Sequence, residues 1–136
     1  MTSRRFPRAV ASLDAIFGFV EEFIAARGIG REHALDVNLV IEELFTNMVK
    51  HSRDGRHEIA IGLDSDAARM TIVVRDFDVE PYDITASESV DTGAPLAERR
   101  PGGLGIHLVR ELTRDLQFEH QGGVTTVTAT LEAGAA

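Results

Sequence analysis

Residues 36–51 read DVNLVIEELFTNMVKH, and this stretch is the strongest structural signal in the chain. Its apolar residues recur at three- and four-residue steps, the spacing of one face of an amphipathic helix: Val37, Val40, Ile41, Leu44 and Met48. Glu43 and Asn47 are four residues apart, so they project as neighbours from a flank of that helix. Such a pair suits an activating base beside a metal ligand, but it is also a common solvent-exposed contact. The pair by itself leaves both interpretations open.

Length and composition restrict the possible functions. With 136 residues, the chain is long enough for one domain, residues 1–136, with a substantial core. It contains no cysteine, which excludes disulfides, thiolate zinc sites and a cysteine nucleophile. The net charge of −8 argues against direct nucleic-acid binding, because phosphate contacts need clustered Lys and Arg. No long apolar run or basic leader is present, so we expect no membrane association and a cytoplasmic location.

The segments before residue 36 predict one strand and one helix. Residues 4–10 are consistent with an edge strand, although Pro7 is unfavourable in a strand. Ser12 is a predicted N-cap for a helix that ends near Gly28. The helix that contains the opening stretch is predicted to run from about residue 31 to residue 51.

The segments after residue 51 predict four more strands and a third helix. Apolar residues alternate over residues 58–64 and 70–76, which predicts two strands joined by a hairpin loop at 65–68. A helix is predicted at 104–112, followed by strands at 116–119 and 124–131. Together these elements predict a two-layer α/β (α+β) sandwich, in which three helices cover a mixed, mostly antiparallel sheet.

Residues 77–103 show no periodicity. This segment of about 27 residues carries three of the four prolines, and long irregular loops in small domains are usually functional. We interpret it as a mobile lid. Its last three residues begin the run Pro101-Gly-Gly-Leu-Gly105, which leads into the predicted helix. Glycines and unpaired amides at a helix start favour a phosphate; a loop hinge is the alternative. Asp76 ends the preceding strand, so its carboxylate either accepts a hydrogen bond from an exocyclic amine or caps the turn.

The order of these features indicates one nucleotide pocket. E-L-F-T-N at 43–47, V-R-D at 74–76 and G-G-L-G-I-H-L-V-R at 102–110 resemble the N, G1 and G2 boxes of the GHKL (Bergerat-fold, HATPase_c) ATPases. Within that superfamily the chain is most similar to the stand-alone anti-sigma factor serine/threonine-protein kinases of the RsbW/SpoIIAB type. The resemblance extends from residue 13 to residue 131 and implies the Bergerat fold, with an ATP lid at about 77–103.

The resemblance also implies a role for particular residues. Glu43 matches the general base that activates the acceptor hydroxyl, and Asn47 matches the ligand of the Mg²⁺ that bridges the nucleotide phosphates. Asp76 matches the residue that binds the adenine amino group. The remaining implied nucleotide contacts are Gly102, Gly103, Leu104 and Gly105 beside the phosphates, and either Thr125 or Thr126 at the adenine end.

The implied function is Mg-ATP-dependent phosphorylation in a partner-switching pathway. The acceptor is expected to be a serine or threonine of a STAS-type anti-anti-sigma factor, and a sigma factor or equivalent regulator is the expected second partner. The resemblance further implies a homodimer. Two alternatives stay open: a non-catalytic partner-binding module of the same fold, and an ATPase or catalytic subunit that acts on histidine or another non-serine target.

One residue departs from the family pattern. The G1 box usually has Asp-x-Gly, whereas this chain has Asp76-Phe-Asp78. A side chain at position 78 is expected to hinder approach to the adenine and to add negative charge, which predicts weak ATP affinity or a shifted loop. Arg99 and Arg100 are the cations just before the lid glycines; they either clamp phosphates or face solvent.

Overall fold

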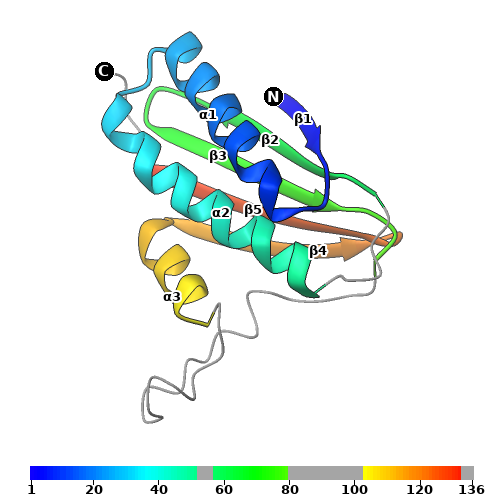
Figure 1. Cartoon of the computed structure of the whole chain (residues 1–136). Helices are drawn as coiled ribbons and strands as arrows, with labels where there is room; N and C mark the ends of the chain where they lie inside the picture. The colour runs from blue at the N-terminus through cyan, green and yellow to red at the C-terminus, as the bar shows by residue number, and fades with distance from the viewer. Residues whose placement is uncertain (52–56, 80–102, 133–136) are drawn as a thin grey trace.

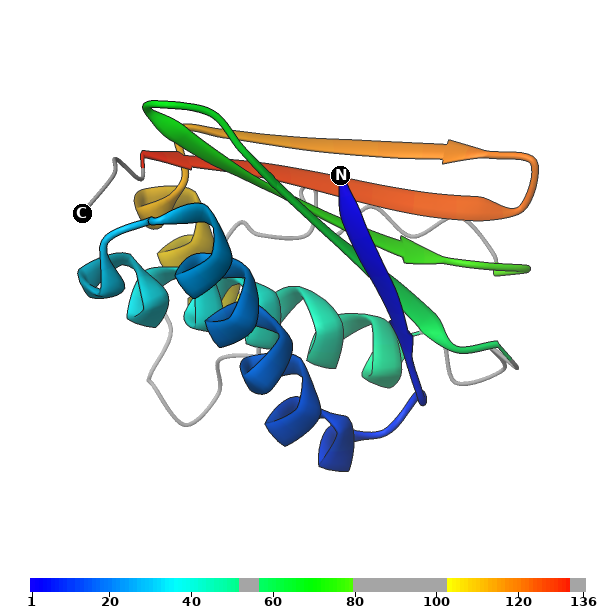
Figure 2. The ribbon, with the colours of Figure 1, turned by 90° about the horizontal axis from the view of Figure 1, so that it is seen from above.

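The helices and the sheet form two separate layers in the computed structural model, which describes residues 1–51, 57–79 and 103–132 (Figure 1). The helices are α1 (Leu13–Arg27), α2 (Ala34–His51) and α3 (Gly103–Leu112), with short 3₁₀ turns at Val10–Ser12 and Arg31–His33. Viewed from above, all three helices lie on the same side of the sheet (Figure 2). Among the described residues, no helix is both long enough and apolar enough to cross a membrane.

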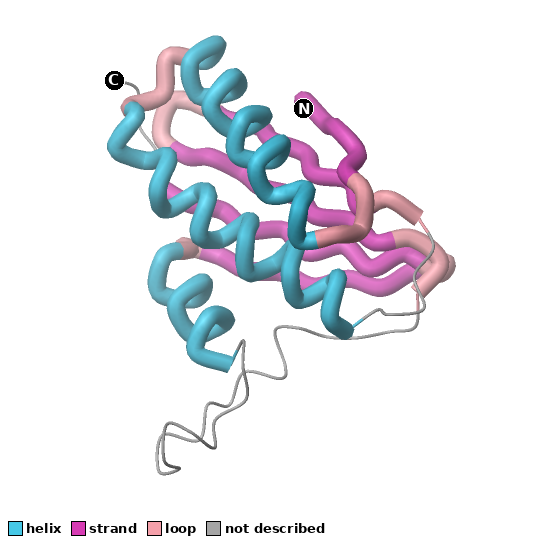
Figure 3. The backbone as a smooth tube through the Cα atoms, viewed as in Figure 1, coloured by secondary structure: helices cyan, strands magenta, loops and turns pink. Residues whose placement is uncertain are grey.

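Five strands make up the sheet in the described part of the chain. They are β1 (Thr2–Phe6), β2 (Ile59–Ser65), β3 (Arg69–Asp76), β4 (Asp115–Gln121) and β5 (Val124–Glu132). Their spatial order is β1-β2-β3-β5-β4, and every neighbouring pair is antiparallel. The strands thus form a continuous sheet behind the helices (Figure 3). The predicted two-layer α/β fold is confirmed.

The core lies between the sheet and the helix layer, and α2 runs through its middle. The predicted apolar face of α2 is fully buried, and Phe45 adds a large side chain to it. On the sheet, Ile61 and Leu63 of β2 and Val127 and Ala129 of β5 face the helices, because alternate strand residues share a face. Burying each large apolar side chain contributes about 1.5–3 kcal/mol. The site residues on α2, β3 and β5 are therefore carried by elements that pack into this core.

Several predicted boundaries and one predicted cap need correction. The strand predicted at 116–119, for example, is the longer β4. The first strand spans Thr2–Phe6 rather than 4–10, because Pro7 cannot continue the backbone pairing with β2. Ser12 occupies the N-cap position of α1 as predicted, but its hydroxyl donates to the Pro7 carbonyl at 2.7 Å instead of accepting from the helix. Residues 31–33 form a 3₁₀ turn before α2. Gly28 ends α1 with a φ of 66°, as predicted.

Two predicted features lie outside the described residues. They are the turn at 52–55 and most of the predicted lid, of which only residues 77–79 and 103 are described.

Candidate functional site

Buried polar side chains are few in the described part of the chain, and three of them are predicted site residues. Asn47, Asp76 and Thr125 are 4%, 1% and 4% exposed, and Ser12 completes the set. Burying a polar group is unfavourable unless it gains hydrogen-bond partners. The partners of these three side chains therefore indicate which of their atoms serve the fold and which remain available to a ligand.

Glu43 and Asn47 contact each other across one turn of α2. The Asn47 Nδ2 atom donates to Glu43 Oε1 at 3.0 Å. Because the carboxylate engages the amide nitrogen, the amide oxygen of Asn47 is left to accept another hydrogen bond or to bind a cation. The sequence left open a solvent-exposed contact, but the structure buries Asn47 and half-buries Glu43.

Burial also changes the acidity of Glu43. Desolvation raises its pKa above the ordinary value, and this effect outweighs the opposing influence of the Asn47 hydrogen bond and of the positive charge on Lys50. A carboxyl group whose pKa is shifted toward neutrality is a better proton acceptor at physiological pH than an ordinary one. Glu43 therefore combines a fixed orientation with the acidity that suits a general base.

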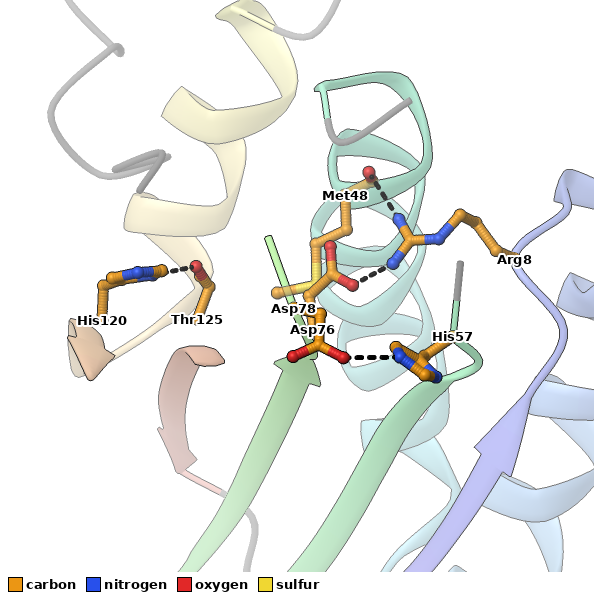
Figure 4. A network of polar contacts seen from close by, with 7 residues as sticks. All are labelled: Arg8, Met48, His57, Asp76, Asp78, His120 and Thr125. Atoms are coloured by element: carbon orange, nitrogen blue, oxygen red, sulfur yellow. Dashed lines mark hydrogen bonds and ion pairs between the residues drawn. The ribbon is translucent and has the colours of Figure 1, made fainter. Parts of the chain in front are cut away.

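Asp76 and Thr125 lie side by side on neighbouring strands. The register pairs Asp76 of β3 with Thr125 of β5, whereas Thr126 pairs with Arg75 and points to the other face of the sheet. Of the two threonines that the sequence could not separate, Thr125 is thus the one beside Asp76. Its Oγ1 atom lies 2.9 Å from Nδ1 of His120, which is its register partner on β4. These three polar side chains form a row across three strands (Figure 4).

Arg8 is a member of this cluster that the sequence did not reveal. It follows β1 and reaches Asp76, where its Nη2 atom donates to Oδ1 in an ion pair. Its Nη1 atom donates to the Met48 carbonyl of α2 at 3.2 Å. The Arg8 side chain is 12% exposed, so both contacts are largely screened from water. No local pattern signals a contact between residues that are 68 positions apart in the sequence.

Asp78 takes up the backbone conformation that a glycine would adopt. Its φ of 54° lies in the left-handed region, which asparagine and aspartate tolerate better than most side chains. Its side chain is 76% exposed and lies 2.6 Å, Oδ2 to Nε2, from His57. The sequence predicted that a side chain at position 78 would hinder the approach of adenine. In the structure the Asp78 side chain is exposed and contacts His57, so it is not buried beside Asp76.

The G2 residues are only partly described. Gly103, Leu104 and Gly105 form the first turn of α3, which packs against α2 through the buried side chains of Ile106 and Val109. Gly102, Arg99 and Arg100 lie outside the described residues. α3 thus packs against the helix that carries Glu43 and Asn47.

The donor set fits a magnesium ion that is held mainly by a phosphate ligand. The described residues contain no group of three or more His, Asp or Glu side chains that could hold a metal. Mg²⁺ commonly binds through one or two protein oxygens together with substrate phosphates and water. The amide oxygen of Asn47 is a suitable single protein ligand for that arrangement.

Comparison with protein families identifies the fold. Residues 6–131 match the model of the histidine kinase-like ATPase domain. The chain belongs to this family. The match covers every site element described above, from Arg8 to β5.

Curated proteins similar to this chain include the serine-protein kinases RsbW of Bacillus thuringiensis and Bacillus cereus. Each is 30% identical over 112 residues. The alignment covers 74% of this chain and 65% of the relative, so the chain matches somewhat less than two thirds of the length of these relatives.

Two solved structures have a similar fold. One is a chain of the SiaB–SiaC complex from Pseudomonas aeruginosa, with a TM-score of 0.60 and 16% identity over 97% of this chain and 89% of the other. Another is a Mycobacterium tuberculosis protein with RsbU and RsbW domains, with the same TM-score and identity over 100% of this chain and 34% of the other. At this level of identity the likeness concerns the fold.

Proposed function

We propose that this domain is a Mg-ATP-dependent protein serine/threonine kinase of a partner-switching pathway. Its acceptor would be a STAS-type anti-anti-sigma factor, and it would also bind and inhibit a sigma factor or an equivalent regulator. The observation that carries the proposal is the burial of the polar residues Asn47, Asp76 and Thr125 on three elements that pack into the apolar core. Membership of the ATPase family and the names of the RsbW relatives support the same assignment.

Each residue has a chemical task in this proposal. Asp76 would accept a hydrogen bond from the adenine amino group, and Thr125 would bind the same end of the nucleotide. Asn47 would place its amide oxygen on Mg²⁺, which neutralises charge on the phosphates when it is bound. The first turn of α3, from Gly103 to Gly105, would present backbone amides to the phosphates.

The transfer itself requires a base and correct alignment. The acceptor hydroxyl oxygen would form a bond to the γ-phosphorus while the bond between that phosphorus and the β,γ-bridging oxygen breaks, which leaves ADP. Glu43 would take the hydroxyl proton, a task that its raised pKa favours. Positioning and charge stabilisation supply most of the rate in reactions of this type.

The principal alternative is a non-catalytic module that binds a partner without ATP. It was suggested by the side chain at position 78. Because Asp78 keeps a left-handed backbone and turns its carboxylate toward His57, that residue gives little support to a loss of ATP binding.

A phosphotransfer assay distinguishes a serine/threonine kinase from the other possibilities. The protein is incubated with Mg²⁺, γ-labelled ATP and candidate STAS-domain proteins, and the label is then tested for stability in acid. We expect acid-stable label on the STAS protein, as for a serine or threonine ester, and its loss in Glu43→Gln. Acid-labile label would indicate a histidine target. Labelling that is unaffected by Glu43→Gln would contradict the proposal that Glu43 is the general base.

A further inference from the structure

The Asp76 carboxylate has one oxygen bonded within the protein and one that is not. Oδ1 receives the Arg8 guanidinium, whereas Oδ2 is buried and has no hydrogen-bond partner among the described residues. A buried carboxylate oxygen without a partner is costly, so it is uncommon unless a ligand completes it. Asp76 is therefore held on one side and open to a donor on the other.

Arg8 reaches Asp76 from the side opposite to the predicted pocket. It follows β1, at one edge of the sheet, whereas Thr125 lies on β5 on the other side of β3. In the close-up, Arg8 stands on one side of Asp76, and Thr125 and His120 stand on the other (Figure 4). A side chain that blocked the pocket would lie between Asp76 and Thr125, and Arg8 does not.

Arg8 also connects two parts of the site. The Met48 carbonyl that it binds belongs to the last turn of α2, where backbone oxygens have no partner within the helix. Met48 follows Asn47 directly in the sequence. A single guanidinium thus fixes the end of β3, which carries Asp76, relative to the turn of α2 that carries Asn47. Its planar fork of donors suits this double contact better than an ammonium group does.

We propose that Arg8 is a positioning residue for nucleotide recognition, which orients the Asp76 carboxylate so that Oδ2 accepts the exocyclic amine of adenine. This inference rests on the proposed function, because it assumes that the domain binds ATP. It assigns to Arg8 a contribution to base discrimination rather than to the chemistry of transfer.

The test compares ATP with purine riboside 5′-triphosphate, which lacks the 6-amino group. Binding of both nucleotides is measured with Mg²⁺ for the wild type, Arg8→Met and Arg8→Lys. We expect the wild type to prefer ATP, and Arg8→Met to reduce that preference about tenfold, the factor for one lost hydrogen bond to a charged group. Affinity for the analogue should fall much less than affinity for ATP, and Arg8→Lys should recover part of the preference. A cooperative unfolding transition above the assay temperature checks that each variant is folded.

Two further variants complete the experiment. Arg114→Met removes the same kind of side chain from an exposed ion pair with Glu132 and should keep the wild-type preference. In an Asp76→Ala background, Arg8→Met should cause no additional loss of preference, because the oriented carboxylate is already absent.

Three outcomes for Arg8→Met would overturn the role of Arg8. The first is an unchanged preference for ATP over the analogue. The second is an equal loss of affinity for both nucleotides, which would indicate a purely structural role, and the third is tighter ATP binding, which would indicate that Arg8 competes with adenine. Failure of the wild type to bind either nucleotide is a different result, because it removes the proposed function together with this inference.

Discussion

Asn47 donates its side-chain amide to Glu43 at 3.0 Å, and this contact fixes the orientation of both groups. The amide nitrogen satisfies the half-buried carboxylate, and the amide oxygen is left for another partner. This one hydrogen bond is compatible with the two roles that we propose for these residues, Glu43 as proton acceptor and Asn47 as metal ligand.

Replacing Glu43 with Gln should stabilise the fold at neutral pH. The folded state raises the pKa of Glu43, so ionising this group is harder in the folded state than in the unfolded chain. The penalty is absent below the ordinary glutamate pKa of about 4.3, and it reaches its full size once the pH exceeds the raised pKa. The gain in Tm of Glu43→Gln over the wild type should therefore be present at pH 7.5 and vanish near pH 4. A gain that is independent of pH would contradict this account.

Removing either member of the Arg8–Asp76 ion pair should strongly destabilise the protein. Asp76 is buried and Arg8 is largely buried, and an uncompensated buried charge typically costs about 3–5 kcal/mol. Chemical denaturation gives the free energy of unfolding of Arg8→Met, Asp76→Asn and the double variant. The double variant should lose clearly less stability than the sum of the losses in the two single variants. Arg114→Met, in an exposed pair, should cost less than about 1 kcal/mol. Additive losses would show that Arg8 and Asp76 do not interact.

Asp78→Ala should be less stable than Asp78→Gly by about 1 kcal/mol. Both variants lose the exposed contact with His57, so they differ mainly in how well each residue tolerates a φ of 54°. Urea denaturation of the two variants measures the difference directly. Equal stabilities would mean that the loop does not hold the left-handed conformation in solution.

Thr125 and Thr126 offer a matched test of the sheet register. Thr125→Val removes the hydroxyl beside Asp76 and should weaken ATP binding about three- to tenfold, as for one lost hydrogen bond. Thr126→Val makes the same change on the opposite face and should leave the affinity unchanged. A loss of affinity in Thr126→Val but not in Thr125→Val would reverse the assignment.

The sequence predicted the elements well because their signals are local. The apolar spacing within residues 36–51 indicates α2, and the alternation of the larger apolar side chains indicates β2 and β3. Asp76 could likewise be placed at the end of its strand from that alternation. Pro7 was the exception, because its effect on the first strand depends on pairing with β2.

The site details that the sequence missed depend on contacts between distant residues. The choice between Thr125 and Thr126 requires the register of β3 against β5, which lie about fifty residues apart in the chain. Arg8 gave no local signal, because its partners are contributed by α2 and β3. At Asp78 the sequence indicated a side chain where glycine is usual, but not the left-handed backbone that accommodates it.

The most direct test of the account is an ATP titration with and without Mg²⁺ for the wild type, Asn47→Ala and Glu43→Gln. The wild type should bind ATP at least about tenfold more tightly with Mg²⁺, a difference of about 1.4 kcal/mol or more. Glu43→Gln should keep this dependence, because its carbonyl still accepts from Asn47, whereas Asn47→Ala should bind equally weakly in both conditions. A wild type that binds no ATP, or an Asn47→Ala variant that retains the full effect of Mg²⁺, would contradict the proposed site.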